Sequence, residues 1–289
     1  MNRVQLAAQL RAPVLALLLV IFPGFGVAHA GGAVSGEVWD QSRFSKARLI
    51  GGRTRENGVE KVFAGVEIVL NKGWKTYWRH PGDAGGVPPS FDWSQSRNVA
   101  SLEVLYPAPQ RFKDFGGFTI GYKNRVLFPV RIVPKRSAEP VELKLALHYG
   151  ICSSICVPVR ETLSFAIPPG KAVKLPRPLK AALSAIPREQ ENRLGSDPML
   201  LSHQVNLEGP KPRIVLDVDF AGYTTGGDVF VEVTGGIYLP MARARPGEKP
   251  GRFVIDLSRV ADRDKLKGQT LHVTLVSKKG HCITHVKID

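Results

Sequence analysis

The sequence predicts an all-β protein that consists of two β-sandwich domains. Glycine and proline are abundant, with 29 and 22 of the 289 residues, as expected for a chain with many tight turns. Runs of β-branched and aromatic residues recur at short intervals between these turn signals, which favours strands over helices. A chain of this length is too long for one small sandwich and suits two domains.

Residues 1–30 have the pattern of a cleavable secretory signal peptide. Arg3 and Arg11 provide the early positive charge, residues 10–22 are mostly apolar, and Ala28-His29-Ala30 is a small-x-small cleavage site. No later run approaches the roughly 18 apolar residues of a spanning helix. We therefore expect a soluble, exported protein, most simply in a bacterial periplasm, where disulfide bonds persist.

The chain carries a net charge of +15, spread over both halves. A diffuse positive surface can favour acidic partners or an anionic membrane face, although a solvated basic surface is the simpler interpretation. Nucleic acid is not an expected partner, because the chain is exported and has no basic-aromatic motif. We find no phosphate-binding glycine loop, nucleophile elbow or pair of carboxylates at a recognisable spacing, so no cofactor is expected.

The first domain is expected to span residues 31–168. Period-two alternation of apolar residues indicates half-buried strands, and the aromatic cluster at 73–78 is expected in the core. In the loop that follows, His80 and Asp83 are expected to be solvated turn residues rather than ligands or a catalytic pair. The segment 107–118 is not expected to be regular. The strands are expected at about 36–40, 46–53, 60–70, 99–106, 120–122, 125–133, 141–151 and 161–167.

Residues 169–200 are expected to link the two domains. Prolines interrupt this segment around one short helix at about 178–186. From residue 201 to 289 short strands resume, and their number and spacing are typical of an immunoglobulin-like sandwich. These strands are expected at about 203–208, 212–219, 228–234, 252–257, 270–277 and 281–288.

Cys152 and Cys156, two of the three cysteines, are separated by only three residues. The alternating residues from 141 to 151 predict a strand with Cys152 on its more polar face. If residues 153–155 form a hairpin loop, the cysteines become opposed neighbours about 4.5–5.5 Å apart at Cα, within reach of a disulfide. A ring this small constrains the unfolded chain little. The spacing therefore favours a working redox pair, with a structural bridge and a metal site as open alternatives.

Three segments around this pair follow one another in a recognisable order: 107–122 (PAPQRFKDFGGFTIGY), 126–130 (VLFPV) and 147–158 (LHYGICSSICVP). Together they resemble the N-terminal periplasmic domain of the DsbD family of thiol:disulfide interchange proteins, in particular its ScsB-like (suppressor of copper sensitivity) branch, over roughly residues 35–167. The resemblance implies an immunoglobulin-like sandwich. It also implies a membrane-embedded thiol electron donor of the DsbD or CcdA type, thioredoxin-fold periplasmic clients, and a link to copper tolerance or cytochrome c maturation.

By position, the resemblance makes Cys152 and Cys156 the redox pair, with Cys156 attacking and Cys152 resolving. Asp114, Phe115 and Gly116 fall in the cap loop of the family, where a phenylalanine shields the cysteines. Such a lid is physically reasonable, because a reduced dithiol in an oxidising compartment needs protection from wrong oxidants.

Two features depart from the DsbD pattern. The DsbD cysteines are more widely spaced than this CxxxC, and the multi-helix membrane domain and thioredoxin-like domain of most members do not follow here. The resemblance therefore implies either a protein-disulfide reductase domain with a separate membrane electron donor or a domain that has lost the relay role, and whether it is an enzyme is left open. No general base is obvious, since His148 lies four residues before Cys152 and is expected opposite Arg160.

The third cysteine, Cys282, lies between His281 and His285. Histidine and thiolate ligands suit zinc or copper(I), so these three residues are the candidate metal ligands. On a strand at 281–288, however, the histidines face one way and Cys282 the other. This favours a buried thiol beside exposed histidines, with no metal site.

The first hypothesis is therefore an exported thiol–disulfide interchange protein that passes electrons through Cys152 and Cys156 to oxidised periplasmic partners. The alternatives are a copper- or metal-binding periplasmic module and a structural, partner-binding sandwich with an inert disulfide. The three differ in the property that would depend on the cysteine pair: exchange, metal binding or stability.

Overall fold

The computed structural model describes residues 40–289 except 115, 171–174, 223–225, 245–246 and 248. The described residues belong to one compact unit, Val34–Asp289. The expected signal peptide and most of the strand expected at 36–40 lie outside them. Within the described part of the chain, no helix has the length and apolar character that a membrane span requires.

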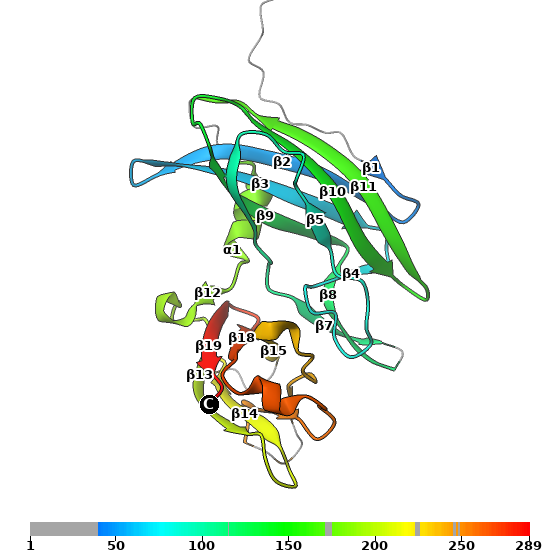
Figure 1. The fold of residues 1–289 in the computed structure, drawn as a ribbon, viewed down its shortest axis with the longest axis vertical. Helices are drawn as coiled ribbons and strands as arrows, with labels where there is room; N and C mark the ends of the chain where they lie inside the picture. The colour runs from blue at the N-terminus through cyan, green and yellow to red at the C-terminus, as the bar shows by residue number, and fades with distance from the viewer. Residues whose placement is uncertain (1–39, 115, 171–174, 223–225, 245–246, 248) are drawn as a thin grey trace, which may run out of the picture. The chain divides into compact units, whose positions relative to one another are not determined.

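The first sheet contains five antiparallel strands in the order β1-β2-β3-β9-β6 (Figure 1). The β2–β3 hairpin turns at Asn57 and Gly58, whose φ angles are +50° and +79°. Asparagine and glycine are the residues that such a two-residue turn favours. The strands are β1 (Asp40–Gln41), β2 (Ser45–Glu56), β3 (Val59–Leu70), β9 (Arg125–Pro134) and β6 (Val99–Val104).

The second sheet has the order β11-β10-β4-β8-β7, and β5 also pairs with β10. Its two longest strands, β10 and β11, form the hairpin that carries the cysteine pair. All pairings in this sheet are antiparallel. The strands are β11 (Cys156–Ile167), β10 (Val141–Cys152), β4 (Lys75–Tyr77), β8 (Gly117–Lys123), β7 (Gln110–Asp114) and β5 (Ser90–Asp92).

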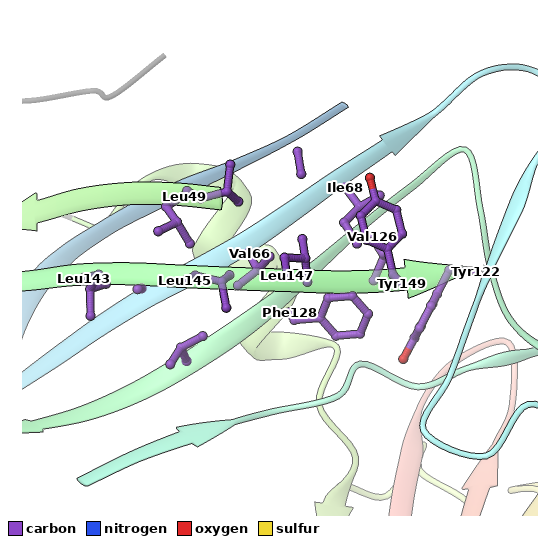
Figure 2. Packing of buried hydrophobic residues seen from close by; sticks show 14 of the residues in the cluster. Leu49, Val66, Ile68, Tyr122, Val126, Phe128, Leu143, Leu145, Leu147 and Tyr149 are labelled. Carbon is purple, nitrogen blue, oxygen red and sulfur yellow. The ribbon is translucent and has the colours of Figure 1, made fainter. Parts of the chain in front are cut away.

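The two sheets face each other across one hydrophobic core. Figure 2 shows Leu145 and Leu147 of β10 clustered with Val66 of β3 and Phe128 of β9, and all four are fully buried. Complete burial of such a side chain stabilises a fold by about 1.5–3 kcal/mol. The predicted alternation in β10 is confirmed from Val141 to Tyr149, where apolar residues are buried and most intervening ones are exposed.

The helix α1 (Arg177–Ser184) covers the outer side of the first sheet, and its bounds lie within two residues of the expected ones. Leu179 of α1 packs with Phe63 of β3 and Leu127 of β9. Gly65 leaves room for this packing, because a Cβ there would lie 2.6 Å from Leu127 Cδ2. As a result β3 is buried on both faces, and its sequence is more continuously apolar than that of a one-sided strand.

The C-terminal sheets contain four strands each and pack on their own core. One has the order β12-β19-β18-β15 and the other β13-β14-β17-β16. The first comprises β12 (Arg188–Glu189), β19 (His281–Lys287), β18 (Thr270–Val276) and β15 (Asp228–Val233). The second comprises β13 (Met199–Asn206), β14 (Arg213–Asp219), β17 (Arg252–Asp256) and β16 (Arg243–Ala244). Short 3-10 turns are η1 (Gln190–Asn192), η2 (Thr234–Gly236) and η3 (Arg263–Leu266).

The expectation that 107–118 is irregular is wrong from residue 110 onward, because β7 and the start of β8 form a hairpin there. Gly116, with φ of +84°, lies in the connection. Aromatic, charged and glycine residues are mixed in this hairpin, so no period-two alternation marks it in the sequence.

The expectation that Asp83 is a solvated turn residue is also wrong. Its carboxylate accepts hydrogen bonds from Tyr238 Oη at 2.9 Å and from Arg243 Nη2 at 2.6 Å. His80 is half-buried, and its ring stacks on Tyr238 with the centroids 5.6 Å apart. These partners lie about 155 residues along the chain, where no local pattern can reveal them. The aromatic residues Tyr77 and Trp78 are buried in the core, as expected.

Candidate functional site

The cysteine pair closes the end of the β10–β11 hairpin. Cys152 and Cys156 are register partners with Cα atoms 4.2 Å apart, and a disulfide joins them. The backbone N–H of Ser153 donates to the carbonyl of Ile155 at 3.0 Å, which closes the three-residue loop. The hairpin predicted from the spacing is therefore confirmed.

The two cysteine residues differ in their exposure to solvent. Cys152 is buried, with 6% of its surface exposed, whereas Cys156 is exposed. Ile155 beside it is 59% exposed and offers an apolar contact next to the reachable sulfur. Cys156 is therefore the more accessible residue of the pair.

Cys152 is buried, although the alternation predicts that it lies on the more polar face of the strand. The alternation ends at Tyr149, and Gly150, Ile151 and Cys152 are all buried. The reason is that β4 pairs with the end of β10, with Lys75 opposite Cys152. The loop at 79–89 adds to this cover, since the N–H of Gly150 donates to the carbonyl of Val87 at 2.9 Å.

Tyr77 is a site residue that sequence reasoning missed. Its hydroxyl lies 3.4 Å from Cys156 Sγ, and because a disulfide sulfur carries no hydrogen, the hydroxyl is the donor. Burial, followed by the nearby Asp114 carboxylate, raises the pKa of Tyr77, so the hydroxyl keeps its proton at neutral pH. The only sequence signal was the aromatic cluster at 73–78, which we assigned to the core.

Two glycines leave the space that the Tyr77 ring occupies. A Cβ at Gly86, where φ is +147°, would lie 2.1 Å from Tyr77 Cε1. A Cβ at Gly150 would lie 3.0 Å from Cε2 on the other edge. The ring thus occupies space that only glycines leave free, and the 79–89 loop fixes its position against the disulfide.

The residues expected to form a cap loop lie on the β7–β8 hairpin, which pairs with β4. Asp114 forms an ion pair with Lys75 Nζ and accepts a hydrogen bond from Thr119 Oγ1 at 2.6 Å. Lys75 is the register partner of Cys152, so the base of the cap hairpin is tied to the strand beside the disulfide. Gly116 is exposed in the connection, and Phe115 lies outside the described residues.

The structure does not bring His148 to the cysteine pair. It is opposite Arg160, as expected, and exposed. Its position four residues before Cys152 corresponds to roughly 13 Å of strand. The structure therefore gives His148 no place as a base for the cysteine pair.

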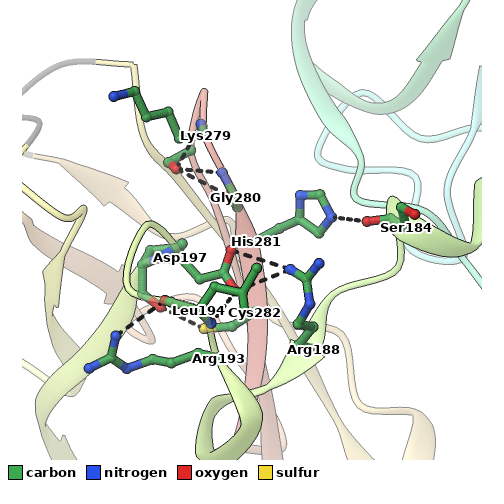
Figure 3. Close-up of polar contacts among 11 residues, drawn as sticks. Ser184, Arg188, Arg193, Leu194, Asp197, Lys279, Gly280, His281 and Cys282 are labelled. Carbon is green, nitrogen blue, oxygen red and sulfur yellow. Dashed lines mark hydrogen bonds and ion pairs between the residues drawn. The ribbon is translucent and has the colours of Figure 1, made fainter. Parts of the chain in front are cut away.

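Cys282 is buried at 0% exposure on β19, on the face opposite to His281 and His285. Its thiol donates to the carbonyl of Pro198 at 2.8 Å, and His281 Nε2 lies 3.3 Å from the carbonyl of Ser184 (Figure 3). Burial, and next the Asp197 carboxylate, raise the pKa of Cys282 to about 12. The expected separation of the thiol from the two histidines is confirmed, and the three side chains do not converge.

We predict that Cys282 does not react with thiol reagents in the folded protein. With a pKa of about 12, roughly one thiol in ten thousand is ionised at pH 8, and the thiolate is the reactive species. Ellman's reagent should therefore find no fast thiol in the oxidised protein and one thiol after unfolding in guanidinium chloride. A fast reaction in native buffer would contradict the buried position.

Comparison with known proteins finds a matching family model and several similar solved structures, among them the following two. Residues 57–168 match the sequence model described as "Thiol:disulfide interchange protein DsbD, N-terminal". The N-terminal periplasmic domain of ScsB from Proteus mirabilis is 19% identical, with a TM-score of 0.65 over 86% of this chain and 96% of that one. The reduced DsbD N-terminal domain of Neisseria meningitidis is 14% identical, with a TM-score of 0.23 over 44% of this chain and 90% of that one. No curated protein matches.

Proposed function

Because residues 57–168 form a DsbD N-terminal-like domain in a fold shared with the ScsB periplasmic domain, we propose that this protein is a periplasmic thiol–disulfide interchange protein. One observation carries the proposal: the disulfide joins an exposed residue, Cys156, to a buried one, Cys152. A bridge that only stapled the hairpin would need no such difference. A bridge that exchanges needs one reachable sulfur and one protected leaving group.

The chemistry follows from this asymmetry. A donor thiolate attacks Cys156 Sγ, the Cys152–Cys156 bond breaks, and Cys152 leaves as a thiolate that takes up a proton. The second thiolate of the donor then attacks the donor sulfur of the mixed disulfide, and Cys156 leaves as a thiolate that takes up a proton. The pair has then gained two electrons and two protons. In the opposite half-reaction, Cys156 thiolate attacks a client disulfide, and Cys152 resolves the mixed disulfide and releases the reduced client.

Tyr77 would assist both half-reactions. Its hydroxyl donates toward Cys156 Sγ, and a hydrogen bond to a charged acceptor contributes more than one to a neutral acceptor. It would therefore stabilise the Cys156 thiolate that attacks the client. The same hydroxyl would stabilise the charge that develops on this sulfur when it leaves the donor.

The finer parts of the proposal rest on the family resemblance. The electron donor would be a membrane-embedded protein of the DsbD or CcdA type, and the clients would be thioredoxin-fold proteins of the periplasm, reached after cleavage at residue 30. A link to copper tolerance or cytochrome c maturation belongs to the same proposal. We further propose that residues 31–168 are the exchange domain and that 201–289 are a second sandwich, joined by the linker at 169–200.

The experiment that tests this function is the reduction potential of the Cys152–Cys156 pair, measured by equilibration of the purified protein in glutathione and dithiothreitol buffers. A value of roughly −120 to −270 mV lies among the exchange proteins and supports the proposal. A value well below about −300 mV marks a structural bridge. It would contradict the proposal and favour the alternative of a structural sandwich with an inert disulfide.

We predict that replacing Tyr77 by phenylalanine raises the pKa of the Cys156 thiol by about one unit, because a hydrogen bond to a charged group is worth about 1.5–3 kcal/mol. The pH dependence of iodoacetamide alkylation measures this pKa, in a Cys152→Ser background where Cys156 is the exposed thiol. The matched control is Tyr106→Phe, which removes a half-buried hydroxyl elsewhere in the domain. Equal titration curves for Tyr77→Phe and the control would remove Tyr77 from the mechanism.

A further inference from the structure

Two histidines of the C-terminal half meet across neighbouring strands. His272 on β18 and His285 on β19 are direct register partners. Their Nδ1 atoms are 2.8 Å apart, and the rings are nearly perpendicular, at 84°, with centroids separated by 4.8 Å. Both side chains reach solvent, since His272 is half-buried and His285 is exposed. Their inner nitrogens therefore converge on one accessible point.

We propose that His272 and His285 form a binding site for a divalent transition-metal ion such as Zn²⁺, with water as the remaining ligands. Imidazole nitrogens suit zinc, copper and nickel. Among the residues that the structure describes, no group of three or more His, Cys, Asp or Glu side chains is placed to hold a metal. The site is therefore an open one with two protein ligands, reached from solvent.

Glu189 orients one of the two ligands. Its Oε2 lies 3.1 Å from His285 Nε2, so that nitrogen carries the hydrogen and donates it to the carboxylate. His285 Nδ1 is then unprotonated and presents its lone pair toward His272. A carboxylate that holds the far nitrogen of a histidine is the common outer partner of metal-binding histidines, because it fixes the tautomer and raises ligand basicity.

The remaining ligand, His272, needs a shift of one proton and a small separation of the two rings. In the metal-free pair, His272 Nδ1 donates its hydrogen to His285 Nδ1, because His285 has given its own to Glu189. When a metal binds, the two rings move apart until each Nδ1 lies about 2.0–2.1 Å from the ion, and the proton of His272 leaves Nδ1 and is carried on Nε2 instead. Both rings stay neutral, and the charge of the ion is met by water and by the neighbouring carboxylate.

This site differs from the ligand set that the sequence offers around Cys282. His285 belongs to it, but His281 is turned toward the carbonyl of Ser184 and Cys282 is buried on the other face of β19. The partner of His285 lies on the neighbouring strand, 13 residues before it. Only the strand register reveals this pairing.

The test is a Zn²⁺ titration of the oxidised, tag-free protein against a chromophoric chelator after removal of metals with EDTA. Zinc is the probe because it has no redox chemistry and leaves the disulfide intact. We expect one equivalent to bind, and His272→Ala and His285→Ala each to weaken binding at least tenfold. Glu189→Gln should weaken it about tenfold, as outer partners do.

His203→Ala is the matched control, since it removes an exposed histidine of the same half on β13, and it should bind zinc as the parent does. A thermal melt of each variant without metal verifies folding, and His272→Asn replaces His272→Ala if the latter is unfolded. Absence of stoichiometric binding by the parent protein would overturn the site. Parent-like binding by both His272→Ala and His285→Ala would also overturn it. Neither outcome depends on the redox role of the cysteine pair.

Discussion

Replacing Cys156 by serine is expected to reduce thiol–disulfide exchange to the background rate while the protein stays folded. The variant retains Cys152, but this sulfur is 6% exposed and lies behind the hairpin end, where a partner thiolate cannot reach it. Loss of the disulfide removes a very small loop closure, which costs about 2 kcal/mol in the chain-entropy estimate. Exchange with oxidised glutathione and with a thioredoxin-fold protein measures the loss, and circular dichroism verifies the fold.

Replacing Cys152 by serine is expected to have a different outcome. Cys156 remains exposed and can attack a partner disulfide, but no second thiol is left to resolve the product. The variant should therefore accumulate a stable mixed disulfide with its partner, visible on a non-reducing gel and by mass spectrometry. The Cys156→Ser variant should form no such adduct.

Cys282→Ser is the control for both variants, because its buried thiol takes no part in the proposed exchange. It should exchange at the parental rate. Exchange retained in Cys156→Ser, or adducts formed through Cys152 alone, would show that the exposed sulfur has been assigned incorrectly. Parental exchange in both cysteine variants would show that exchange does not pass through this pair.

The part of this site that the sequence predicts is the part determined by local spacing. Three residues between Cys152 and Cys156, after an alternating strand, are enough to predict the hairpin, the register and the disulfide, because strand periodicity has only two faces. The alternation also predicts the buried side of β10. The same reasoning separates Cys282 from His281 and His285 on β19.

Contacts between segments far apart in the sequence could not be predicted in this way. Tyr77 reaches Cys156 only because β4 pairs with the end of β10, 74 or more residues away in the chain. The same pairing buries Cys152, contrary to the alternation. Asp83 and Tyr238 likewise meet across 155 residues. In each case the tertiary structure, and not the local sequence, determines which residue is the partner.

Glycine positions show the same limit. The sequence contains 29 glycines, and many of those that the structure describes adopt a positive φ in turns. At Gly86 the positive φ and the adjacent Tyr77 ring both require the absence of a side chain. Nothing in the local sequence distinguishes it from its neighbour Gly85, which also has a positive φ but has nothing within 4 Å of its would-be Cβ.

Replacing Gly86 by alanine is expected to have the largest effect on stability, because of the Tyr77 ring beside it. The added methyl group would lie 2.1 Å from Tyr77 Cε1, and Gly150 on the opposite edge leaves the ring little room to retreat. Overpacking costs about 1–3 kcal/mol and a strained backbone conformation a further 1–3 kcal/mol. We therefore expect the free energy of unfolding to fall by about 3 kcal/mol or more, as measured by urea denaturation of the oxidised protein.

Gly85→Ala is the matched control, because it introduces the same methyl group at a positive φ without the clash. It should lower the free energy of unfolding only by the cost of the strained backbone, about 1–2 kcal/mol. A double-mutant cycle with Tyr77→Ala isolates the contact, since removing the ring should relieve most of the extra cost and leave a coupling energy of about 1–3 kcal/mol. Equal losses for the two glycine variants, or additive effects in the cycle, would mean that the 79–89 loop does not hold Tyr77 against the disulfide.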